Sequence, residues 1–415
     1  MTNIPNHAPE TKLPAYIQNV VDGKTTTNYG RGIPINDGAG PARTLIAEYR
    51  SKCPNELVNI LERSEYMGDF NLTPQLPANG LTVLELFCGG GIGAIGFKAA
   101  GYDIVKALDF DKNAVKAYRH NFGEHVEQAD ISEVDIDSLP DTDVIFGGPP
   151  CQDFSVAGKG AGADGERGKL VWRYLEIIAA KQPKAFIFEN VKGLITKRHR
   201  PTFDTLIEKF NEIGYEISWR VMSAWDYGVA QKRERVFIVG VRKDLGFTFE
   251  FPEPLEGDYQ TRVLRDVIGD LPESNNEGYG LRNDEKPFAH KIPDGGNWRN
   301  LTEEEKLIYW NGKVPTKGGS TNGLRKRAWG EPAGTITTSP LQKLSCQLHP
   351  EETGKSPRRF TVRECLRIQS APDTYVLPDD ISLSAQYRIV GNGIAPRVAW
   401  YIGRALADQL ASASN

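Results

Sequence analysis

LTVLELFCGGGIGAIGFKAAG, residues 81–101, is the stretch that decides the fold of this chain. Its first part, LTVLELF, is an apolar run with a single acid, which is typical of a strand buried on both faces of a sheet. Three consecutive glycines then permit a tight turn, and IGAIGFKAAG predicts a helix that ends at Gly101. A strand, a glycine-rich turn and a helix in this order predict the first unit of an α/β sheet.

The same alternation continues as far as residue 241. A second strand is predicted over 102–109 and a second helix over 111–123. Because strands alternate with helices, the sequence predicts a parallel, doubly wound sheet. The other predicted strands are 142–148, 185–190, 217–222 and 235–241, and the other predicted helices lie near 170–181 and 202–213.

The rest of the chain is less regular. A length of 415 residues suggests two or three domains. From about 251 to 330 the sequence is rich in Pro, Gly and Asn and has weak periodicity, which predicts a second, smaller domain. Helical patterns return at 361–369 and 395–410, and a further helix is predicted over about 42–65.

Composition argues against several classes of protein. The five cysteines are scattered and form no CxxC pair, and the six histidines lack ligand spacing, so we expect no metal site and no disulfide scaffold. No apolar run reaches the length of a membrane span and no secretory signal opens the chain, so we expect a cytoplasmic protein without a membrane partner. The net charge of −4 disfavours a nucleic-acid partner unless the basic residues gather on one surface.

The glycine-rich turn matches the pattern GxGxxG at Gly91, Gly93 and Gly96, and Asp109 ends the next strand. This spacing favours a nucleotide-like cofactor, with its ribose hydroxyls bound by the acid, and it also suits a nicotinamide dinucleotide. The pattern alone is a weak signal, because a tight strand-to-helix turn without a ligand has the same glycines.

Two reactive side chains follow predicted strands. Cys151 comes directly after GGPP at the end of one strand, Glu189 closes another, and residues 231–235 (QKRER) lead into a third. Because function gathers at the carboxyl ends of strands in an open α/β sheet, a thiol, a carboxyl and guanidinium groups can converge there. Each has a simpler interpretation, a packed cysteine and a solvated acid. No histidine lies in these motifs, so a Cys–His protease pair has no support.

Six motifs in order make residues from about 81 to 411 resemble the DNA (cytosine-5)-methyltransferases of bacterial restriction–modification systems. Two departures are small, since the last glycine of the family's loop is displaced and Asp109 stands where Glu is common. The resemblance does not extend to residues 1–78. The motifs are LELFCGGGIG (84–93), GGPPCQDFS (147–155), ENV (189–191), DYGVAQKRERVFIVG (226–240), RRFTVRECLRIQSAPD (358–373) and YRIVGNGIAPRVA (387–399).

The resemblance implies a Rossmann-like methyltransferase domain, dependent on S-adenosyl-L-methionine, with a smaller irregular target-recognition domain. Residues 1–78 would be an N-terminal extension of unknown role, and 79–250 the catalytic and cofactor-binding domain. Target recognition would occupy 251–345, and residues 346–415 would return to the catalytic domain.

The resemblance also implies a mechanism. The Cys151 thiolate would add to C6 of cytosine and make C5 nucleophilic, while Glu189 binds N3 and the exocyclic amine. Arg233 and Arg235 would bind O2 of the base, or position the thiolate and a nearby phosphate. Methyl transfer would leave S-adenosyl-L-homocysteine, and loss of the C5 proton would expel the thiol. Because a base inside a duplex cannot reach Cys151, the target would be flipped out.

By the same resemblance, the cofactor would lie in the glycine-rich turn and between the ends of neighbouring strands, and the last motif would close its pocket. DNA would contact the nucleophile loop and the basic segment of the recognition domain. The implied cofactor residues are Phe87, Gly89, Gly90, Gly91, Asp109, Phe110, Asp130, Ile131, Pro150, Leu170, Asn392 and Ile394. The implied DNA-binding residues are Ser155, Arg325, Arg327 and Thr337.

The sequence therefore favours a monomeric enzyme that methylates double-stranded DNA in a bacterial cytoplasm, associated with the nucleoid. A cognate restriction endonuclease would act on the same site without stable association. A tRNA cytosine-C5 methyltransferase is the second interpretation, although the large variable segment favours DNA. A nicotinamide-dependent dehydrogenase is the third, and it leaves the motifs at Cys151, Glu189 and 231–235 unexplained.

Overall fold

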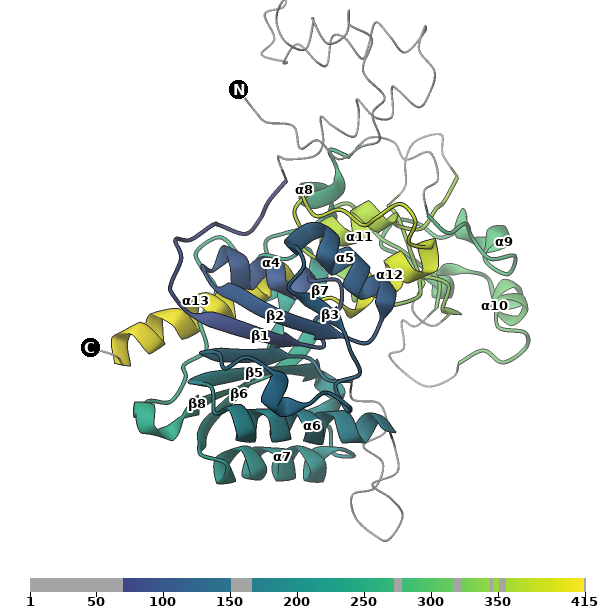
Figure 1. Cartoon of the computed structure of the whole chain (residues 1–415). Coiled ribbons are helices and arrows are strands. Elements are labelled where there is room, and N and C mark those ends of the chain that lie inside the picture. The colour runs from purple at the N-terminus through teal and green to yellow at the C-terminus, as the bar shows by residue number, and fades with distance from the viewer. Residues whose placement is uncertain are drawn as a thin grey trace, which may run out of the picture. The chain divides into compact units, whose positions relative to one another are not determined.

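The computed structural model describes residues 70–150, 166–271, 278–315, 323–343, 346–350 and 356–413 (Figure 1). All of them belong to one compact unit of the chain, residues 66–415. The helix predicted over about 42–65 lies outside the described residues, as do Cys151 and Ser155.

A seven-stranded sheet forms the centre of this unit (Figure 1). Its strand order is β3-β2-β1-β4-β5-β8-β6, so the order reverses at β1, which lies between β2 and β4. Ligands of open α/β sheets bind beyond the carboxyl ends of the strands at such a reversal. The strands are β1 (Thr82–Leu86), β2 (Asp103–Asp109), β3 (Val126–Gln128), β4 (Val144–Gly147), β5 (Ala185–Val191), β6 (Tyr215–Ser223) and β8 (Glu234–Arg242).

The prediction of an α/β sheet is confirmed, but the prediction that the sheet is parallel throughout is wrong at one strand. Neighbours from β3 to β5 pair in parallel, whereas β8 runs antiparallel to both β5 and β6. Ser223 pairs with Glu234, and residues 224–233 between them are too few for the helical crossover that a parallel connection needs. The chain therefore turns back beside the strand it has just left.

Helices cover both faces of the sheet (Figure 1). Side chains of a strand alternate between the two faces, so Val83 of β1 packs in the cluster that includes α4 and α13, and Leu84 packs in the cluster under α6 and α7. These positions are fully buried, which explains the continuous apolar run that predicted the strand. The helices are α4 (Ile92–Ala99), α5 (Lys112–Phe122) and α13 (Pro396–Ala413) on one face, and α6 (Glu166–Lys181) and α7 (Arg200–Glu212) on the other.

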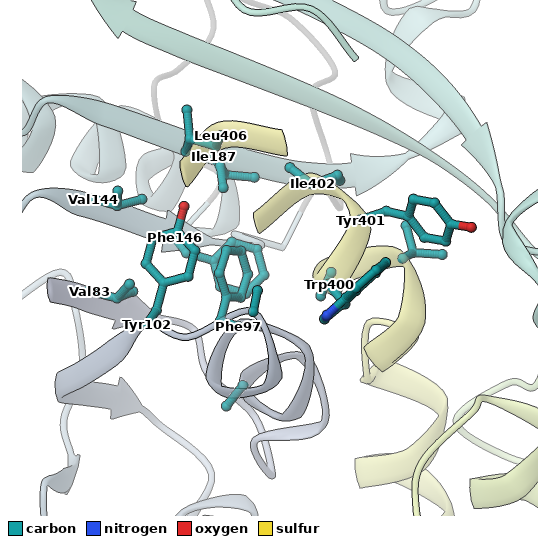
Figure 2. Packing of buried hydrophobic residues seen from close by; sticks show 14 of the residues in the cluster. Val83, Phe97, Tyr102, Val144, Phe146, Ile187, Trp400, Tyr401, Ile402 and Leu406 are labelled. Carbon is teal, nitrogen blue, oxygen red and sulfur yellow. The ribbon is translucent and has the colours of Figure 1, made fainter. Parts of the chain in front are cut away.

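Figure 2 shows that α13 packs into the hydrophobic cluster between the sheet and α4. Phe97 of α4 lies 4.5 Å from Phe146 of β4, ring centre to ring centre, and Trp400 of α13 lies in the same cluster. A Cβ atom on Gly96 would stand 2.2 Å from the carbonyl oxygen of Pro396. The third glycine of GxGxxG therefore allows α4 and α13 to approach each other, a packing role that needs no ligand.

Of the remaining elements, those within 264–268 and 360–390 pack in a cluster with α4 and α5, whereas those within 288–324 and 346–348 have a small core of their own. The small core includes Phe288, Trp298, Tyr309 and Leu324, all buried. Two parallel two-stranded sheets join β9 to β11 and β10 to β7. The elements are β7 (Gln231–Lys232), α8 (Leu264–Ile268), α9 (Lys286–Ala289), α10 (Glu303–Tyr309), β9 (Arg325–Lys326), β10 (Ala333–Gly334), β11 (Gln347–Leu348), α11 (Val362–Ile368) and α12 (Leu383–Asn392), with 3-10 turns at Ile136–Ser138, Lys192–Ile195, Ala224–Tyr227, Lys243–Leu245 and Trp298–Asn300.

The helices predicted at 361–369 and 395–410 correspond to α11 and α13. Among the described residues, no helix has both the length and the apolar character required to cross a membrane.

Candidate active site

The glycine-rich turn after β1 is built from unusual backbone angles. Phe87, Gly89 and Gly91 all have positive φ, at 56°, 55° and 82°. Gly91 is the N-cap of α4, and a Cβ atom there would stand 2.4 Å from the ring of Phe122 and 2.8 Å from that of Tyr118. Both the backbone angle and the close rings therefore require glycine at this position.

Asp109, at the end of β2, holds this turn. Its Oδ2 atom accepts a hydrogen bond from the N–H of Gly89 at 2.8 Å, and its Oδ1 atom accepts one from the N–H of Asp111 at 2.8 Å. Burial raises the pKa of this carboxyl, while the two backbone hydrogen bonds act in the opposite direction. Each carboxylate oxygen still has acceptor capacity for a ligand hydroxyl.

The surroundings of the turn fit S-adenosylmethionine. A Cβ atom on Gly89 would meet no atom within 4 Å, so the main chain is open to a ligand here. The ring of Phe110, beside Asp109, is 71% exposed and offers a free aromatic face for a purine. Asp130 follows β3, where its Oδ1 atom accepts hydrogen bonds from the N–H and the hydroxyl of Ser132, and Ile131 next to it is buried.

Two C-terminal segments close on the same turn. The hydroxyl of Tyr375 donates a hydrogen bond to the carbonyl oxygen of Gly90 at 2.7 Å. A Cβ atom on Gly93 would stand 3.6 Å from Cβ of Ile394, so the segment after α12 lies against the start of α4. Ile394 therefore lies beside the first turn of α4, and the closure of a cofactor pocket by Asn392 and Ile394 stays a prediction. Pro150 is exposed beyond the end of β4, and Leu170 is half-buried on α6.

Glu189 and Arg235 form an ion pair near the carboxyl end of β5. Nε of Arg235 lies 2.9 Å from Oε1 of Glu189, and both side chains are mostly buried. A Cβ atom on Gly148 would stand 2.9 Å from Oε2 of Glu189, so this acid lies against the turn that follows β4. Burial raises the pKa of Glu189, and the charges of Arg235 and Arg233 oppose that rise.

Asn190 holds the turn that follows β4 through a side-chain hydrogen bond. Its Nδ2 atom donates to the carbonyl oxygen of Pro149 at 3.0 Å, and its Oδ1 atom accepts from the N–H of Val191 at 2.8 Å. Pro150 is the last described residue before Cys151, so the chain enters the predicted nucleophile segment from a point fixed beside Glu189.

The two predicted arginines have different partners. Whereas Arg235 pairs with Glu189, Arg233 donates to the carbonyl oxygens of Ile336 and Gly391, each at 3.1 Å. Burial and the charge of Arg235 lower the pKa of Arg233 to about 9, and Glu189 acts in the opposite direction. These main-chain partners have no signature in the sequence, because any residue can supply a carbonyl group.

The predicted DNA-binding arginines lie in the short sheet of β9 and β11. Arg325 lies on β9 and pairs with Glu331 at 2.9 Å, and Arg327 donates from Nε to Oε1 of Gln347 at 2.8 Å. Arg327 is buried, and burial together with the charge of Arg325 lowers its pKa to about 10. The hydroxyl of Thr337 donates to the carbonyl oxygen of Ser339 at 3.1 Å. Whether these residues contact DNA stays a prediction.

One buried acid near the glycine-rich turn was not among the predicted site residues. Glu85 of β1 faces the core and accepts a hydrogen bond from the hydroxyl of Tyr118 at 3.0 Å. Burial raises the pKa of Glu85 to about 8, against the effect of that hydrogen bond. The signal was its place as the single acid in LTVLELF. In the part of the chain that the structure describes, no three His, Cys, Asp or Glu side chains are grouped to hold a metal ion.

Comparison with known proteins agrees with this geometry. Residues 81–408 match the family described as C-5 cytosine-specific DNA methylase. The chain is 39% identical to Type II methyltransferase M.Sau96I of Staphylococcus aureus, over 79% of this chain and 76% of that protein. It is 36% identical to Type II methyltransferase M.FnuDI of Fusobacterium nucleatum, over 80% and 95%.

Solved structures show the same fold. The S. pombe Dnmt2 methyltransferase superposes with a TM-score of 0.59 at 17% identity, over 80% of this chain and 98% of that one. The Entamoeba histolytica methyltransferase EhMeth gives the same score and identity, over 82% and 100%. The predicted Rossmann-like methyltransferase fold is confirmed, and so are the predicted enzyme class and cofactor. The chain belongs to the C-5 cytosine-specific DNA methylase family and is a DNA cytosine methyltransferase that uses S-adenosylmethionine.

Proposed function

We propose that the enzyme methylates C5 of a cytosine flipped out of duplex DNA at a specific site, through a covalent bond between the Cys151 sulfur and C6. The observation that carries this proposal is the Glu189–Arg235 pair, which lies against the turn leading to Pro150 and Cys151. Activation of cytosine needs a carboxyl and a thiol, and this carboxyl lies beside the turn after which the sequence places Cys151.

The chain's own groups divide the reaction between them. The Cys151 thiolate forms a bond to C6, and the electron pair of the C5–C6 double bond moves to C5. Glu189 holds its proton at N3 and accepts from the exocyclic amine, which stabilises the charge that builds on the ring. Its raised pKa favours the protonated form that this role requires. Arg235 fixes the orientation of the carboxyl and binds O2 of the base.

When bound, S-adenosylmethionine supplies an electrophilic methyl group. After transfer, the C5 proton leaves to a base, the C5–C6 double bond forms again, and the Cys151 thiolate is expelled. Asp109 would bind the ribose hydroxyls, and Phe110 would stack on the adenine. The other cofactor residues that we propose are Phe87, Gly89, Gly90, Gly91, Asp130, Ile131, Pro150, Leu170, Asn392 and Ile394.

The proposed chemistry requires base flipping, since C6 of a cytosine stacked in a duplex is not accessible to an enzyme nucleophile. We propose that residues 251–345 read the site, with Arg325, Arg327 and Thr337 among the contacts and Ser155 contributing from the nucleophile segment. Residues 79–250 and 346–415 would form the catalytic domain, and 1–78 an extension.

The named similarity to Type II methyltransferases supports a protective role in restriction–modification. We propose that the enzyme acts as a monomer and shares its site with an endonuclease without stable association.

Bisulfite sequencing of DNA from a bacterial host that expresses the chain tests this function. We expect conversion-resistant cytosines at one short sequence, and extracted DNA that resists an endonuclease specific for that sequence. Expression of the Cys151→Ser variant is the matched control. Methylation scattered without sequence preference, or equal methylation by the variant, would contradict the proposal.

A further inference from the structure

Arg233 lies between two segments that serve different parts of the proposed site. It follows β7, and its buried guanidinium donates to the carbonyl oxygens of Ile336 and Gly391, each at 3.1 Å. Ile336 precedes Thr337, which we assign to DNA, and Gly391 precedes Asn392, which we assign to the cofactor. One side chain therefore bridges the two segments.

The two segments are also in direct contact. A Cβ atom on Gly391 would stand 2.4 Å from the carbonyl carbon of Thr337 and 2.4 Å from the nitrogen of Thr338. Only glycine permits so close an approach of one main chain to another. A displacement of residues 337–338 would therefore press directly on the end of α12.

β7, which directly precedes Arg233, also holds the segment that leads to Thr337. Gln231 and Lys232 pair in parallel with Ala333 and Gly334 of β10. Oε1 of Gln231 also accepts a hydrogen bond from the N–H of Ile336 at 2.9 Å. Arg233 then adds the bond to the carbonyl oxygen of the same Ile336, so both main-chain groups of this residue are held.

We propose that Arg233 is a positioning residue that couples DNA binding to cofactor binding by holding the segment of Thr337 against the end of α12. This inference rests on the proposed function, which assigns Thr337 to DNA and Asn392 to the cofactor. Arg235, which pairs with Glu189, remains the arginine that faces the base.

The chemistry of the side chain suits this role. A planar guanidinium directs its two Nη groups along fixed, diverging lines, so it can bridge two carbonyl oxygens with one orientation. Loss of either bond would leave a buried carbonyl group unpaired, which favours a rearrangement of the segment. Because both bonds of Arg233 end on main-chain oxygens, the side chain is already engaged before a base enters.

The test measures how strongly one ligand changes the affinity for the other. S-adenosylhomocysteine binding is followed by calorimetry with and without a duplex that carries the site found by bisulfite sequencing. For the wild type, we expect the duplex to tighten this binding about 5-fold or more, and the same factor must appear in DNA affinity. In Arg233→Met and Arg233→Lys, this factor should fall towards one, while the affinity for each ligand alone changes much less.

Arg242→Lys is the matched control, because Arg242 also donates to a main-chain oxygen, that of Gln182, but lies at the far end of β8. It should keep the wild-type factor. A wild type without coupling, or Arg233 variants that retain it, would overturn the inference. So would a failure of Arg233→Lys to fold, since that would make Arg233 a residue of general stability. If the wild type bound neither ligand, the proposed function itself would fail.

Discussion

The sheet and residues 251–345, which we propose as the recognition region, are stabilised in different ways. In the sheet, strands of three to nine residues pair in one continuous sheet, and residues such as Ile145, Ile187 and Ile238 are completely buried between two layers of helices. Between residues 251 and 345, the described strands are two residues long. The buried acid Glu285 has an arginine as an ion-pair partner. That arginine is Arg359 of the C-terminal segment, which also donates to the carbonyl oxygen of Pro340 at 2.7 Å.

This difference suits the two tasks. The chemistry needs strand ends at fixed places, and main-chain ladders with apolar packing hold these without directional side chains. A surface that reads DNA needs polar side chains, and buried hydrogen-bonded pairs specify one arrangement of a segment that lacks long strands. The predictions that follow test each side of this comparison.

The largest expected effect is on chemistry at the sheet. Glu189→Gln should slow single-turnover methylation by a factor of about 10² to 10⁴, since an amide cannot hold a proton at N3. DNA affinity should change far less. Glu234→Gln is the control, because its carboxyl is half-exposed and pairs with Lys192 at 2.7 Å. Equal losses of rate and affinity in Glu189→Gln would indicate a binding role instead.

The proposed recognition region should be most sensitive at Glu285, whose buried partner is Arg359 of the C-terminal segment. Arg359→Met removes the buried partner of Glu285 and leaves Arg282, 3.3 Å away, as its remaining ion-pair partner, so we expect a loss of up to about 3–5 kcal/mol in the free energy of unfolding. Arg200→Met removes an exposed pair with Asp204 and should cost less than about 1 kcal/mol. Urea unfolding of both variants measures the difference, and similar losses would contradict the contrast between buried and exposed pairs.

Two buried acids should give opposite dependence of stability on pH. Burial raises the pKa of Glu85 from 4.5 to about 8, so the folded state binds the extra proton and stability should fall as pH rises between these values. Burial also acts to raise the pKa of Glu364, but hydrogen bonds with His349 and Arg358 lower it to about 2. Its contribution should therefore be lost as pH falls from 4.5 towards 2.

Melting temperatures across pH check both signs. Glu85→Gln should flatten the decline above pH 4.5, and Glu364→Gln should flatten the decline below it. An unchanged pH profile in either variant would show that the carboxyl in question does not titrate as its surroundings imply.

The smallest expected effect concerns base reading. Arg325→Ala or Arg327→Ala should cost about 1–3 kcal/mol of discrimination on the cognate duplex if the side chain binds a guanine edge. A phosphate contact would instead weaken all sequences alike and make the salt dependence shallower. Both residues lie beside Glu331, so a base contact requires exchange of that partner. Unchanged affinity and preference in both variants would place the reading surface elsewhere in 251–345.

Most of the sheet could be predicted because its strands carry their own signals. The apolar runs of β1, β4 and β5 reflect burial on both faces, and the glycine turn reflects backbone angles that other residues avoid. The direction of β8 was not predictable from its own residues, since it depends on the length of the segment before it.

The site residues could be predicted where they lie in a recognisable sequence motif, as Glu189, Arg233 and Arg235 do. Glu189 and Arg235 were both marked by motifs, but they pair because β8 runs antiparallel, which brings its first residues beside the last residues of β5. The partners of Arg233 are carbonyl groups from residues 336 and 391. The hydrogen-bond partner of Arg327 is Gln347, which lies 20 residues further along the chain on β11. Contacts of this kind depend on tertiary structure, which leaves no local pattern in the sequence.

Covalent trapping tests the central claim, that methyl transfer proceeds through a bond between Cys151 and C6. A duplex with 5-fluorocytosine at the target cytosine blocks release of the enzyme, because fluorine cannot leave as a proton does. With S-adenosylmethionine present, the wild type should form a denaturation-resistant complex with this duplex, whereas Cys151→Ser should bind cofactor and DNA but form none. An active wild type that cannot be trapped, or a Cys151→Ser variant trapped as efficiently, would contradict the mechanism.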